Sequence, residues 1–205
     1  MEPPSKAAGG MTISPTIVTA GDSKFEWELA SVAGDAGYRR PRRLCMKKVL
    51  QQGAVLVLCV AVCFAAAAVG AAFTSPSIPG WYATLDRPSW TPPSWVFGPV
   101  WSFLYLLMGI STWQVWRKAG FRAAVAPLVL FSIQLVLNAA WSGLFFGLRS
   151  PGVALIDIVL LWCAILVTMI AFWRRSTPAG WLMLPYLAWV SFAVALNLAI
   201  WKLNR

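Results

Sequence analysis

Residues 80–101 read GWYATLDRPSWTPPSWVFGPVW, and the rest of the chain is interpreted around this stretch. It holds four tryptophans and four prolines around Asp86 and Arg87, the only charged residues between positions 49 and 116. Proline restricts the backbone and lacks an N–H donor, so the segment predicts an ordered loop. Tryptophan is enriched at membrane–water interfaces. We expect this loop to cap a bundle of membrane helices and to form the lid of a pocket for a flat apolar ligand.

Long apolar segments flank this loop on both sides. Hydrophobic residues make up 59% of the 205 residues. A helix needs about 20 apolar residues to cross the hydrocarbon core. The sequence therefore predicts an all-α integral membrane protein, a bundle of five transmembrane helices in residues 49–205. The spans are expected near residues 49–73, 94–116, 124–147, 152–173 and 180–201.

Residues 1–48 differ in composition from the rest of the chain. Gly, Pro, Ser, Thr and Ala dominate residues 1–38 without a sustained apolar period, which predicts a disordered N-terminal extension. The extension ends in a basic cluster that is typical of a juxtamembrane anchor to an anionic leaflet. Its members are Arg39, Arg40, Arg42, Arg43, Lys47 and Lys48.

Basic residues are distributed unevenly between the two ends of the predicted bundle. Eleven lie near the spans at the end that carries the N-terminus, and four lie at the other end. The positive-inside rule then places the N-terminus in the cytosol and the tryptophan-rich loop on the opposite face. Neither a cleavable signal nor a transit peptide is visible. We expect a multi-pass protein of an intracellular membrane, either ER/Golgi or the mitochondrial outer membrane.

The absence of histidine excludes several classes of function. Ser-His-Asp triads, histidine metal sites and His-ligated haem all need an imidazole. The four cysteines show no CxxC spacing, so neither disulfides nor a zinc site is expected. We predict no metal and no obligatory cofactor. The formal charge of +10 lies at the edges of apolar runs, which predicts contact with the lipid bilayer and not with nucleic acid.

Three predicted spans each carry an aromatic face with a small polar component. At helical spacing these faces comprise Trp101, Tyr105 and Met108, then Asn138, Trp141 and Phe145, then Tyr186, Trp189 and Ala193. Such faces are either aromatic core packing or the walls of a cavity for a planar hydrophobic molecule. Their occurrence beneath a loop rich in tryptophan and proline favours the cavity.

Asp157 is the only acidic residue inside a predicted span. An ionised carboxylate within the bilayer needs a partner, and Asn138 is one candidate. Alternatively, Asp157 lies near the membrane edge, a few residues past Pro151, where it is solvated or caps a helix turn. The sequence leaves both interpretations open.

Ala139, Gly143 and Gly147 recur at a spacing of four on the third span. A stripe of small residues lets another helix approach closely. It either packs within the monomer or forms the seam of a homodimer, and we slightly favour the homodimer.

Three segments of the chain resemble one known family. They are WYATLDRPSWTPPSWVFGPVW, LNAAWSGLFFG and LPYLAWVSFAVALNLAIW. Together they resemble the translocator protein family, also called tryptophan-rich sensory proteins or peripheral-type benzodiazepine receptors, over roughly residues 50–202. Residues 1–48 look like the extension of plant members. The resemblance implies a five-helix bundle, often dimeric through its third helix, that binds porphyrins, sterols and synthetic ligands.

Carried over by position, the resemblance implies a tetrapyrrole site for porphyrin or haem. The implied ligand-binding residues are Tyr82, Pro92, Trp101, Tyr105, Asn138, Trp141, Asp157, Trp189 and Ala193. Trp90 and Trp95 are expected to anchor the lid, and Asp86 and Arg87 to form a salt bridge within it. Leu198 stands where the sterol motif of animal members has a tyrosine, which argues against sterol binding.

Three functions follow from these observations. The leading hypothesis is tetrapyrrole binding for sequestration, transport or stress signalling. The first alternative is an enzyme that breaks porphyrin down in light, with Trp101 and Trp189 as the catalytic candidates. The second alternative is a regulatory scaffold that acts through the N-terminal extension.

Overall fold

The structure is a computed structural model that describes residues 23–205, with side chains described for residues 45–120 and 122–205. The chain divides into two units, Met1–Lys48 and Val49–Arg205, and each is described by itself. In the first unit, residues from Ser23 onward are helical. The second unit contains the helix bundle.

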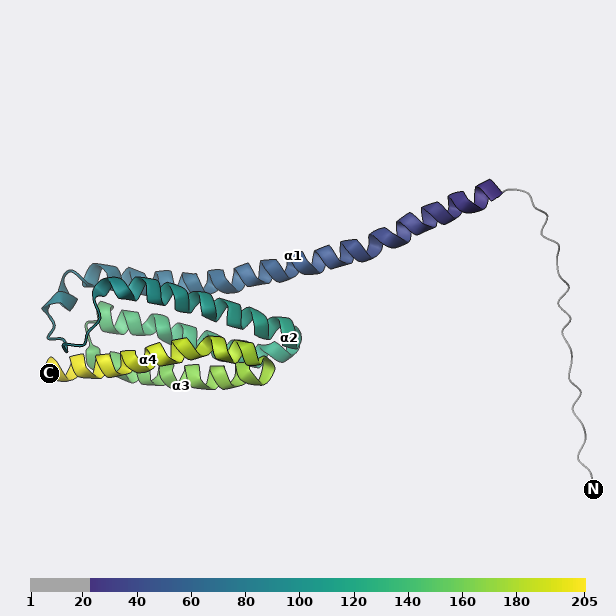
Figure 1. Ribbon diagram of the computed structural model, residues 1–205. Coiled ribbons are helices and arrows are strands. Elements are labelled where there is room, and N and C mark those ends of the chain that lie inside the picture. Colours follow the sequence, from purple (N-terminus) through teal and green to yellow (C-terminus); the bar gives the residue numbers. More distant parts are fainter. Residues whose placement is uncertain (1–22) are drawn as a thin grey trace, which may run out of the picture. The chain divides into compact units, whose positions relative to one another are not determined.

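The described part of the chain is built from helices, and no strand occurs in residues 23–205. The long helices are α1 (Ser23–Ser77), α2 (Ser94–Ser142), α3 (Pro151–Arg175) and α4 (Thr177–Leu203) (Figure 1). The short ones are the 3-10 helix η1 (Trp81–Thr84) and the π-helix η2 (Gly143–Gly147).

Five segments in the described residues are long and apolar enough to cross a membrane. They are Cys45–Ser77, Ser94–Gly120, Arg122–Gly147, Pro151–Arg175 and Thr177–Leu203. The predicted all-α bundle of five transmembrane helices is confirmed. Each predicted span differs from the observed one by at most four residues at either end.

α1 begins earlier than the first predicted span. Its bounds place residues 23–48 in a helix, although the sequence analysis assigned them to the disordered extension. This segment contains several Ala, Glu, Arg and Lys residues, which have high helix propensity, but no apolar period that would bury one face. The predicted disorder of residues 1–22 lies outside the described residues.

Gly120 separates the two spans that lie within α2. Its φ of 70° and ψ of 169° are not helical, and a positive φ is readily adopted only by glycine. The first span ends at Gly120 and the second begins at Arg122. Figure 1 shows α2 reversing its direction at this place. The break lets two spans of one α2 pack side by side.

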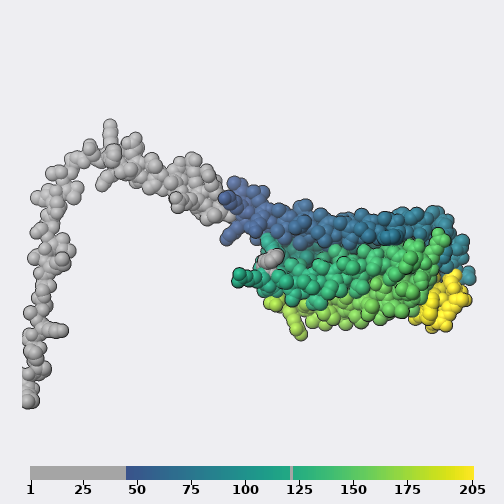
Figure 2. Space-filling model, turned by 180° about the vertical axis from the view of Figure 1, so that it is seen from behind, coloured from purple at the N-terminus to yellow at the C-terminus, as the bar shows by residue number. Residues whose placement is uncertain are grey.

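The core of the second unit lies where α2, α3 and α4 pack together. Met108, Ile165, Phe172 and Met183 are fully buried there. α1 packs less closely, since only 11% of its most apolar window is buried, compared with 33–39% for the other spans. Figure 2 shows the α1 residues of the second unit along one side of the bundle. α1 is therefore an outer wall whose far side is available to lipid.

Gly109 sets the distance between α1 and α2. A Cβ atom built at Gly109 would lie 2.7 Å from Cγ2 and 2.8 Å from Cα of Val60. The second of these atoms belongs to the backbone, so no change of rotamer relieves the overlap. Small residues allow such close helix contact in membranes. The close contact of α1 with α2 therefore requires a residue without a side chain at position 109.

We expect Gly109→Ala to lower the free energy of unfolding by about 1–3 kcal/mol, because the added methyl group overpacks the interface between α1 and α2. Thermal unfolding in detergent measures the effect. Gly53→Ala is the matched control, because a Cβ atom at Gly53 meets nothing within 4 Å. Equal melting temperatures for the two variants would contradict the assigned contact.

Candidate ligand-binding site

A cavity of about 480 Å³ lies in the second unit. Its wall is formed by α1, η1, both spans of α2, η2 and α4, and α3 contributes no residue to it. Sites for small molecules typically enclose about 300–1,000 Å³ and are lined mainly by apolar and aromatic side chains. The cavity fits this description.

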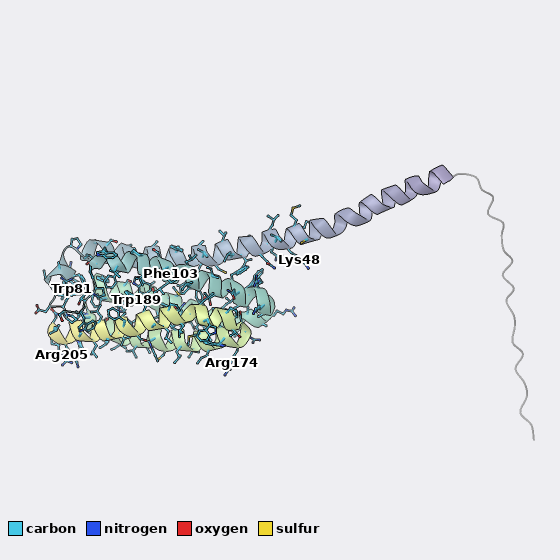
Figure 3. The ribbon with its side chains drawn as sticks, viewed as in Figure 1. Lys48, Trp81, Phe103, Arg174, Trp189 and Arg205 are labelled. Atoms are coloured by element: carbon cyan, nitrogen blue, oxygen red, sulfur yellow. The ribbon has the colours of Figure 1, made fainter. Side chains whose placement is uncertain are left out.

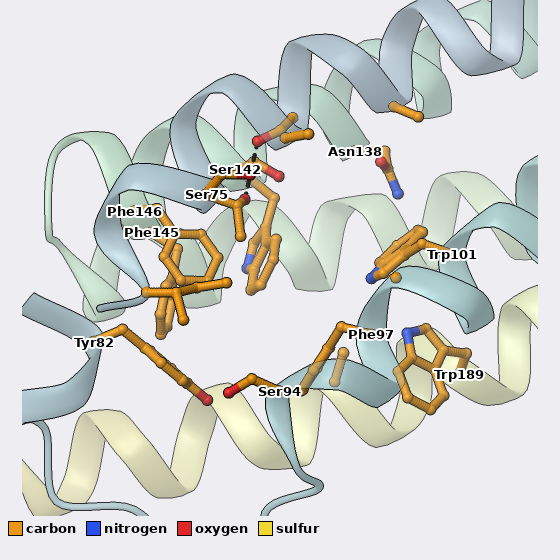
Figure 4. Close-up of a pocket in the computed structure, with 18 of the residues that line it drawn as sticks. Ser75, Tyr82, Ser94, Phe97, Trp101, Asn138, Ser142, Phe145, Phe146 and Trp189 are labelled. Carbon is orange, nitrogen blue, oxygen red and sulfur yellow. Dashed lines mark hydrogen bonds between the residues drawn. The ribbon is translucent and has the colours of Figure 1, made fainter. Parts of the chain in front are cut away.

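Most of the predicted ligand-binding residues line this cavity. They are Tyr82, Trp101, Tyr105, Asn138, Trp141, Trp189 and Ala193. In Figure 4, Trp101 and Trp189 lie at one end, and Tyr82 lies at the other beside Phe145 and Phe146. The helical faces read from the sequence therefore point to one shared space.

The structure does not bring Pro92 or Asp157 to the cavity wall. Asp157 lies on α3, whose residues do not reach the cavity. The expected pairing of Asp157 with Asn138 is also wrong, since the Asn138 amide is bonded to two tyrosines. Among the described residues, Oδ2 of Asp157 is buried and has no hydrogen-bond partner. Asp157 is only 8% exposed, which argues against a solvated carboxylate, and the alternative in which it caps a helix turn stays a prediction.

A chain of buried hydrogen bonds connects Tyr105, Asn138, Tyr186 and Gln134. The Tyr105 hydroxyl donates to Oδ1 of Asn138. Nδ2 of Asn138 donates to the Tyr186 hydroxyl at 3.0 Å, and that hydroxyl donates to Oε1 of Gln134 at 2.9 Å. Buried polar groups are costly unless they are bonded, so the chain stabilises both spans of α2 against α4. It leaves Tyr105 and Asn138 as polar groups of the cavity wall.

Asn197 holds the indole of Trp141 in place. Nε1 of Trp141 donates to Oδ1 of Asn197 at 3.0 Å, and Nδ2 of Asn197 donates to the carbonyl oxygen of Pro151 at 2.8 Å. Both Trp141 and Asn197 line the cavity. Asn197 was not among the residues predicted from the sequence, although an amide inside an apolar span is a recognisable signal.

Aromatic rings form much of the remaining wall. The Trp101 ring centroid lies 5.5 Å from that of Tyr105. The Trp189 centroid lies 5.5 Å from Phe192 and 5.9 Å from Phe97. These separations are typical of favourable aromatic pairs. The rings support one another and present apolar surface to a planar ligand.

The π-helix η2 places two consecutive phenylalanines at the cavity. The Leu148 N–H donates to the Gly143 carbonyl oxygen at 2.8 Å, which is the i→i+5 bond of a π turn. Phe145 and Phe146 are both buried, and their centroids lie 6.3 and 5.6 Å from that of Tyr82. The sequence pattern assumed a regular α-helix and therefore identified only Phe145.

Tyr82 closes the lid end of the cavity beneath Arg87. Cζ of Arg87 lies 5.2 Å from the centre of the Tyr82 ring. Burial raises the pKa of the Tyr82 phenol, while the Arg87 charge acts in the opposite direction. The net shift is upward, so the phenol stays neutral at physiological pH.

The loop is tied to the end of α4 through Asn204. The Asp86 N–H donates to Oδ1 of Asn204 at 3.0 Å, and Nδ2 of Asn204 donates to the Asp86 carbonyl oxygen at 2.9 Å. The expected Asp86–Arg87 salt bridge does not form within the described residues, because Arg87 lies over Tyr82. The lid is therefore positioned by backbone contacts of Asp86 and not by its charge.

The two expected lid anchors behave differently. The Trp90 ring packs edge-on against Phe192, with centroids 5.7 Å apart, which agrees with an anchoring role. Trp95 is 75% exposed and lines the cavity, so it lies at the rim and does not hold the lid in place. Other exposed lining residues are Phe64, Ala71, Ser75, Ser94, Gly98 and Ser102. Because they belong to α1 and the first span of α2, the cavity opens between these helices.

The small-residue stripe of the third span contacts α1 of the same chain. A Cβ atom at Gly147 would lie 3.2 Å from Cδ1 of Phe73, and one at Gly143 would lie 3.9 Å from the same ring. Ala139 is partly exposed. The geometry at both glycines matches the alternative in which the stripe packs within the monomer.

The fold and the site define a multi-pass integral membrane protein built around an aromatic cavity. Residues 59–202 match the TspO/MBR family, and the chain belongs to that family. The resemblance recognised in the sequence is therefore confirmed.

Three relatives illustrate the range of similarity. The chain is 48% identical over 153 residues to "Tryptophan-rich protein TspO" of Chlorobaculum tepidum, covering 73% of this chain and 95% of that protein. It is 44% identical over 139 residues to "Translocator protein" of Homo sapiens, covering 67% and 82%. It is 35% identical over 151 residues to "Tryptophan-rich sensory protein" of Cereibacter sphaeroides, covering 74% and 92%.

Proposed function

We propose that this protein binds a tetrapyrrole, either porphyrin or haem, in the aromatic cavity for sequestration, transport or stress signalling. The observation that carries the proposal is that Trp101 and Trp189 line one cavity of about 480 Å³ together with Tyr105 and Trp141. Flat apolar rings stack favourably on indole and phenol faces. Asn138 supplies an amide that can orient the ligand's carboxylates or pyrrole nitrogens.

Metal-free porphyrin is expected to bind at least as well as haem. Haem iron in proteins is commonly held by His, Cys, Met or Tyr. The chain has no histidine, and no cysteine or methionine lines the cavity. Tyr82 and Tyr105 are the only lining residues of a type that ligates haem iron. Affinity should therefore come from the ring and its carboxylates.

A ligand titration tests this function. Purified protein in detergent is titrated with protoporphyrin, haem and a sterol, and the porphyrin absorption band and tryptophan fluorescence are followed. We expect saturable binding of protoporphyrin and haem at one molecule per chain, and no saturable binding of the sterol. Tryptophan quenching that rises without saturation would overturn the proposal.

The same samples distinguish the enzymatic alternative. Both candidate indoles, Trp101 and Trp189, line the same cavity, which is the arrangement that this alternative requires. A new absorption spectrum that appears on illumination only with the wild-type protein, and not with a Trp101→Ala, Trp189→Ala variant, would support light-dependent porphyrin breakdown. Bleaching identical to that of free pigment would count against it.

We also propose that the N-terminus faces the cytosol in an intracellular membrane, ER/Golgi or mitochondrial outer. The support is the charge asymmetry of the bundle, whose N-terminal end carries Arg117, Lys118, Arg122, Arg174 and Arg175 next to the spans. An N-terminal epitope tag should be accessible to antibody after selective permeabilisation of the plasma membrane. A tag reached only after full permeabilisation would reverse this orientation.

We propose separately that the protein forms a homodimer, although Gly143 and Gly147 of the predicted seam contact Phe73 of the same chain. Light scattering in detergent should give twice the mass of one chain after correction for bound detergent. A monomeric mass would contradict it, and would leave the contact of Gly143 and Gly147 with Phe73 as the whole role of these two stripe residues.

Deletion of residues 1–38 should leave protoporphyrin affinity unchanged. All lining residues of the cavity lie between Phe64 and Ile200, so the deletion removes none of them. The measurement is the same titration on the truncated protein. Under the scaffold alternative, the truncation instead changes abundance or partner binding. Loss of porphyrin binding would contradict the placement of the site.

A further inference from the structure

A second hollow lies between α2 and α3. Ala126, Pro127 and Leu130 of α2 and Ala171 of α3 form an apolar floor, and Arg174 and Arg175 complete the lining. Figure 3 shows Arg174 at the end of the bundle opposite Trp81 and Arg205. This groove is therefore remote from the lid of the aromatic cavity.

In the part of the chain whose side chains the structure describes, no carboxylate lies near the two guanidinium groups. Within residues 45–205, Asp86 and Asp157 are the only acids. Asp86 lies in the lid loop, and Asp157 precedes Arg174 by 17 positions on α3, about 25 Å at 1.5 Å per residue. The carboxyl end of α3 contributes only about half a negative charge. The rim of the groove therefore keeps more than one positive charge.

The two arginines also stand at the depth of lipid headgroups. They occupy the last turn of α3, a helix of 25 residues, whereas about 20 residues cross the hydrocarbon core. The apolar floor residues Leu130 and Ala171 lie on the membrane side of this turn. The groove has guanidinium groups at headgroup level and an apolar floor next to the acyl chains. It is therefore complementary to a lipid with an anionic headgroup.

We propose that this groove binds one anionic phospholipid per chain, with the lipid phosphate held by Arg174 and Arg175 and an acyl chain on the apolar floor. A guanidinium group binds phosphate through two parallel hydrogen bonds. Basic pockets between transmembrane helices recognise anionic headgroups in general. A zwitterionic lipid carries its own cation near the phosphate, so it competes poorly for a site with this charge.

The chain offers a matched control for nonspecific attraction. Lys118 and Arg122 are exposed next to the same end of the spans but do not line the groove. Lys118→Gln with Arg122→Gln removes the same charge as Arg174→Gln with Arg175→Gln. All four side chains are exposed, so both double variants are expected to fold.

Native mass spectrometry of the full chain, with phosphatidylglycerol or phosphatidylcholine added to the detergent, tests the site. We expect one phosphatidylglycerol retained per chain, and retention about 30-fold weaker in the Arg174→Gln, Arg175→Gln variant, from a factor of about five for each basic contact. The Lys118→Gln, Arg122→Gln variant should retain the lipid. Ala126→Phe should reduce retention without any change of charge, because it fills the exposed part of the floor.

Three results would overturn the proposal. Equal loss in both double variants would show diffuse attraction to the basic end of the bundle. Retention of phosphatidylcholine equal to that of phosphatidylglycerol would show that the groove does not select an anionic headgroup. Displacement of the lipid by millimolar inorganic phosphate would indicate a small-anion site that does not use the apolar floor.

Discussion

Replacing Trp101 and Trp189 together with alanine should weaken protoporphyrin binding about 100-fold, at roughly 1.4 kcal/mol for each lost ring contact. Both indoles line the cavity, and each is supported by neighbouring rings. Their removal leaves the supporting rings of Tyr105 and Phe192 in place. The loss therefore reports mainly on contacts with the ligand.

The shift of the porphyrin absorption band is the appropriate measurement, because removal of two of the 13 tryptophans changes the fluorescence signal itself. Trp116→Ala with Trp181→Ala is the matched control, since neither residue lines the cavity. That variant should bind as the wild type does. If the Trp101, Trp189 variant kept wild-type affinity, the proposed site would be wrong.

Asn138→Leu should lower the free energy of unfolding by about 2 kcal/mol. The substitution removes two side-chain hydrogen bonds and leaves the Tyr105 hydroxyl without its acceptor. Single hydrogen bonds between membrane helices contribute about 0.6 kcal/mol on average, so the two lost bonds account for about 1.2 kcal/mol and the stranded Tyr105 hydroxyl for the rest. Thermal unfolding in detergent gives the size of the effect.

A double variant separates the lost bonds from the stranded hydroxyl group. Replacing Asn138 with leucine and Tyr105 with phenylalanine removes the amide and the stranded hydroxyl together, while the Tyr186 hydroxyl still donates to Oε1 of Gln134. Removal of both partners of a hydrogen bond is often nearly neutral, so the double variant should recover stability relative to Asn138→Leu alone. A double variant less stable than Asn138→Leu would contradict the described chain of hydrogen bonds.

The sequence correctly predicted several lining residues of the cavity that lie on regular helices. Trp101 and Tyr105 are four positions apart, as are Trp189 and Ala193, and each pair lines the cavity. Helical periodicity alone places such residues on one face. The same reasoning placed Met108 and Tyr186 on these faces, but both are core residues with no exposed surface. Periodicity indicates the inner face of a helix without separating core from cavity.

The missed parts of the site depend on departures from a regular helix or on contacts distant in sequence. Phe146 reaches the cavity because η2 is a π-helix, and no residue type in the segment GLFFG predicts a π-helix. Asn197 matters because it meets Trp141, 56 positions away. Asp86 is held by Asn204, 118 positions away, where an Asp86–Arg87 pair was expected.

The contacts of α1 could not be predicted from the sequence either. Its run of small apolar residues predicted close contact with another helix but did not indicate which helix. The structure places Phe64, Ala67 and Ala71 on the cavity wall and Val60 against Gly109. Lipid is as apolar as a neighbouring helix, so hydrophobicity does not indicate which side of α1 faces the bundle. That side is set by where α2 leaves space for it.

The sequence by itself determined that the chain crosses a membrane five times, that its tryptophan-rich loop lies between the first two spans, and which family it belongs to. Hydrocarbon thickness and helical rise translate apolar length into spans, so no tertiary contact is needed for these conclusions. Only the tertiary structure decided that Asp157 lies away from the cavity and that Gly143 faces Phe73. The rotation and spacing of packed helices depend on side chains from several spans at once, and a single span does not contain that information.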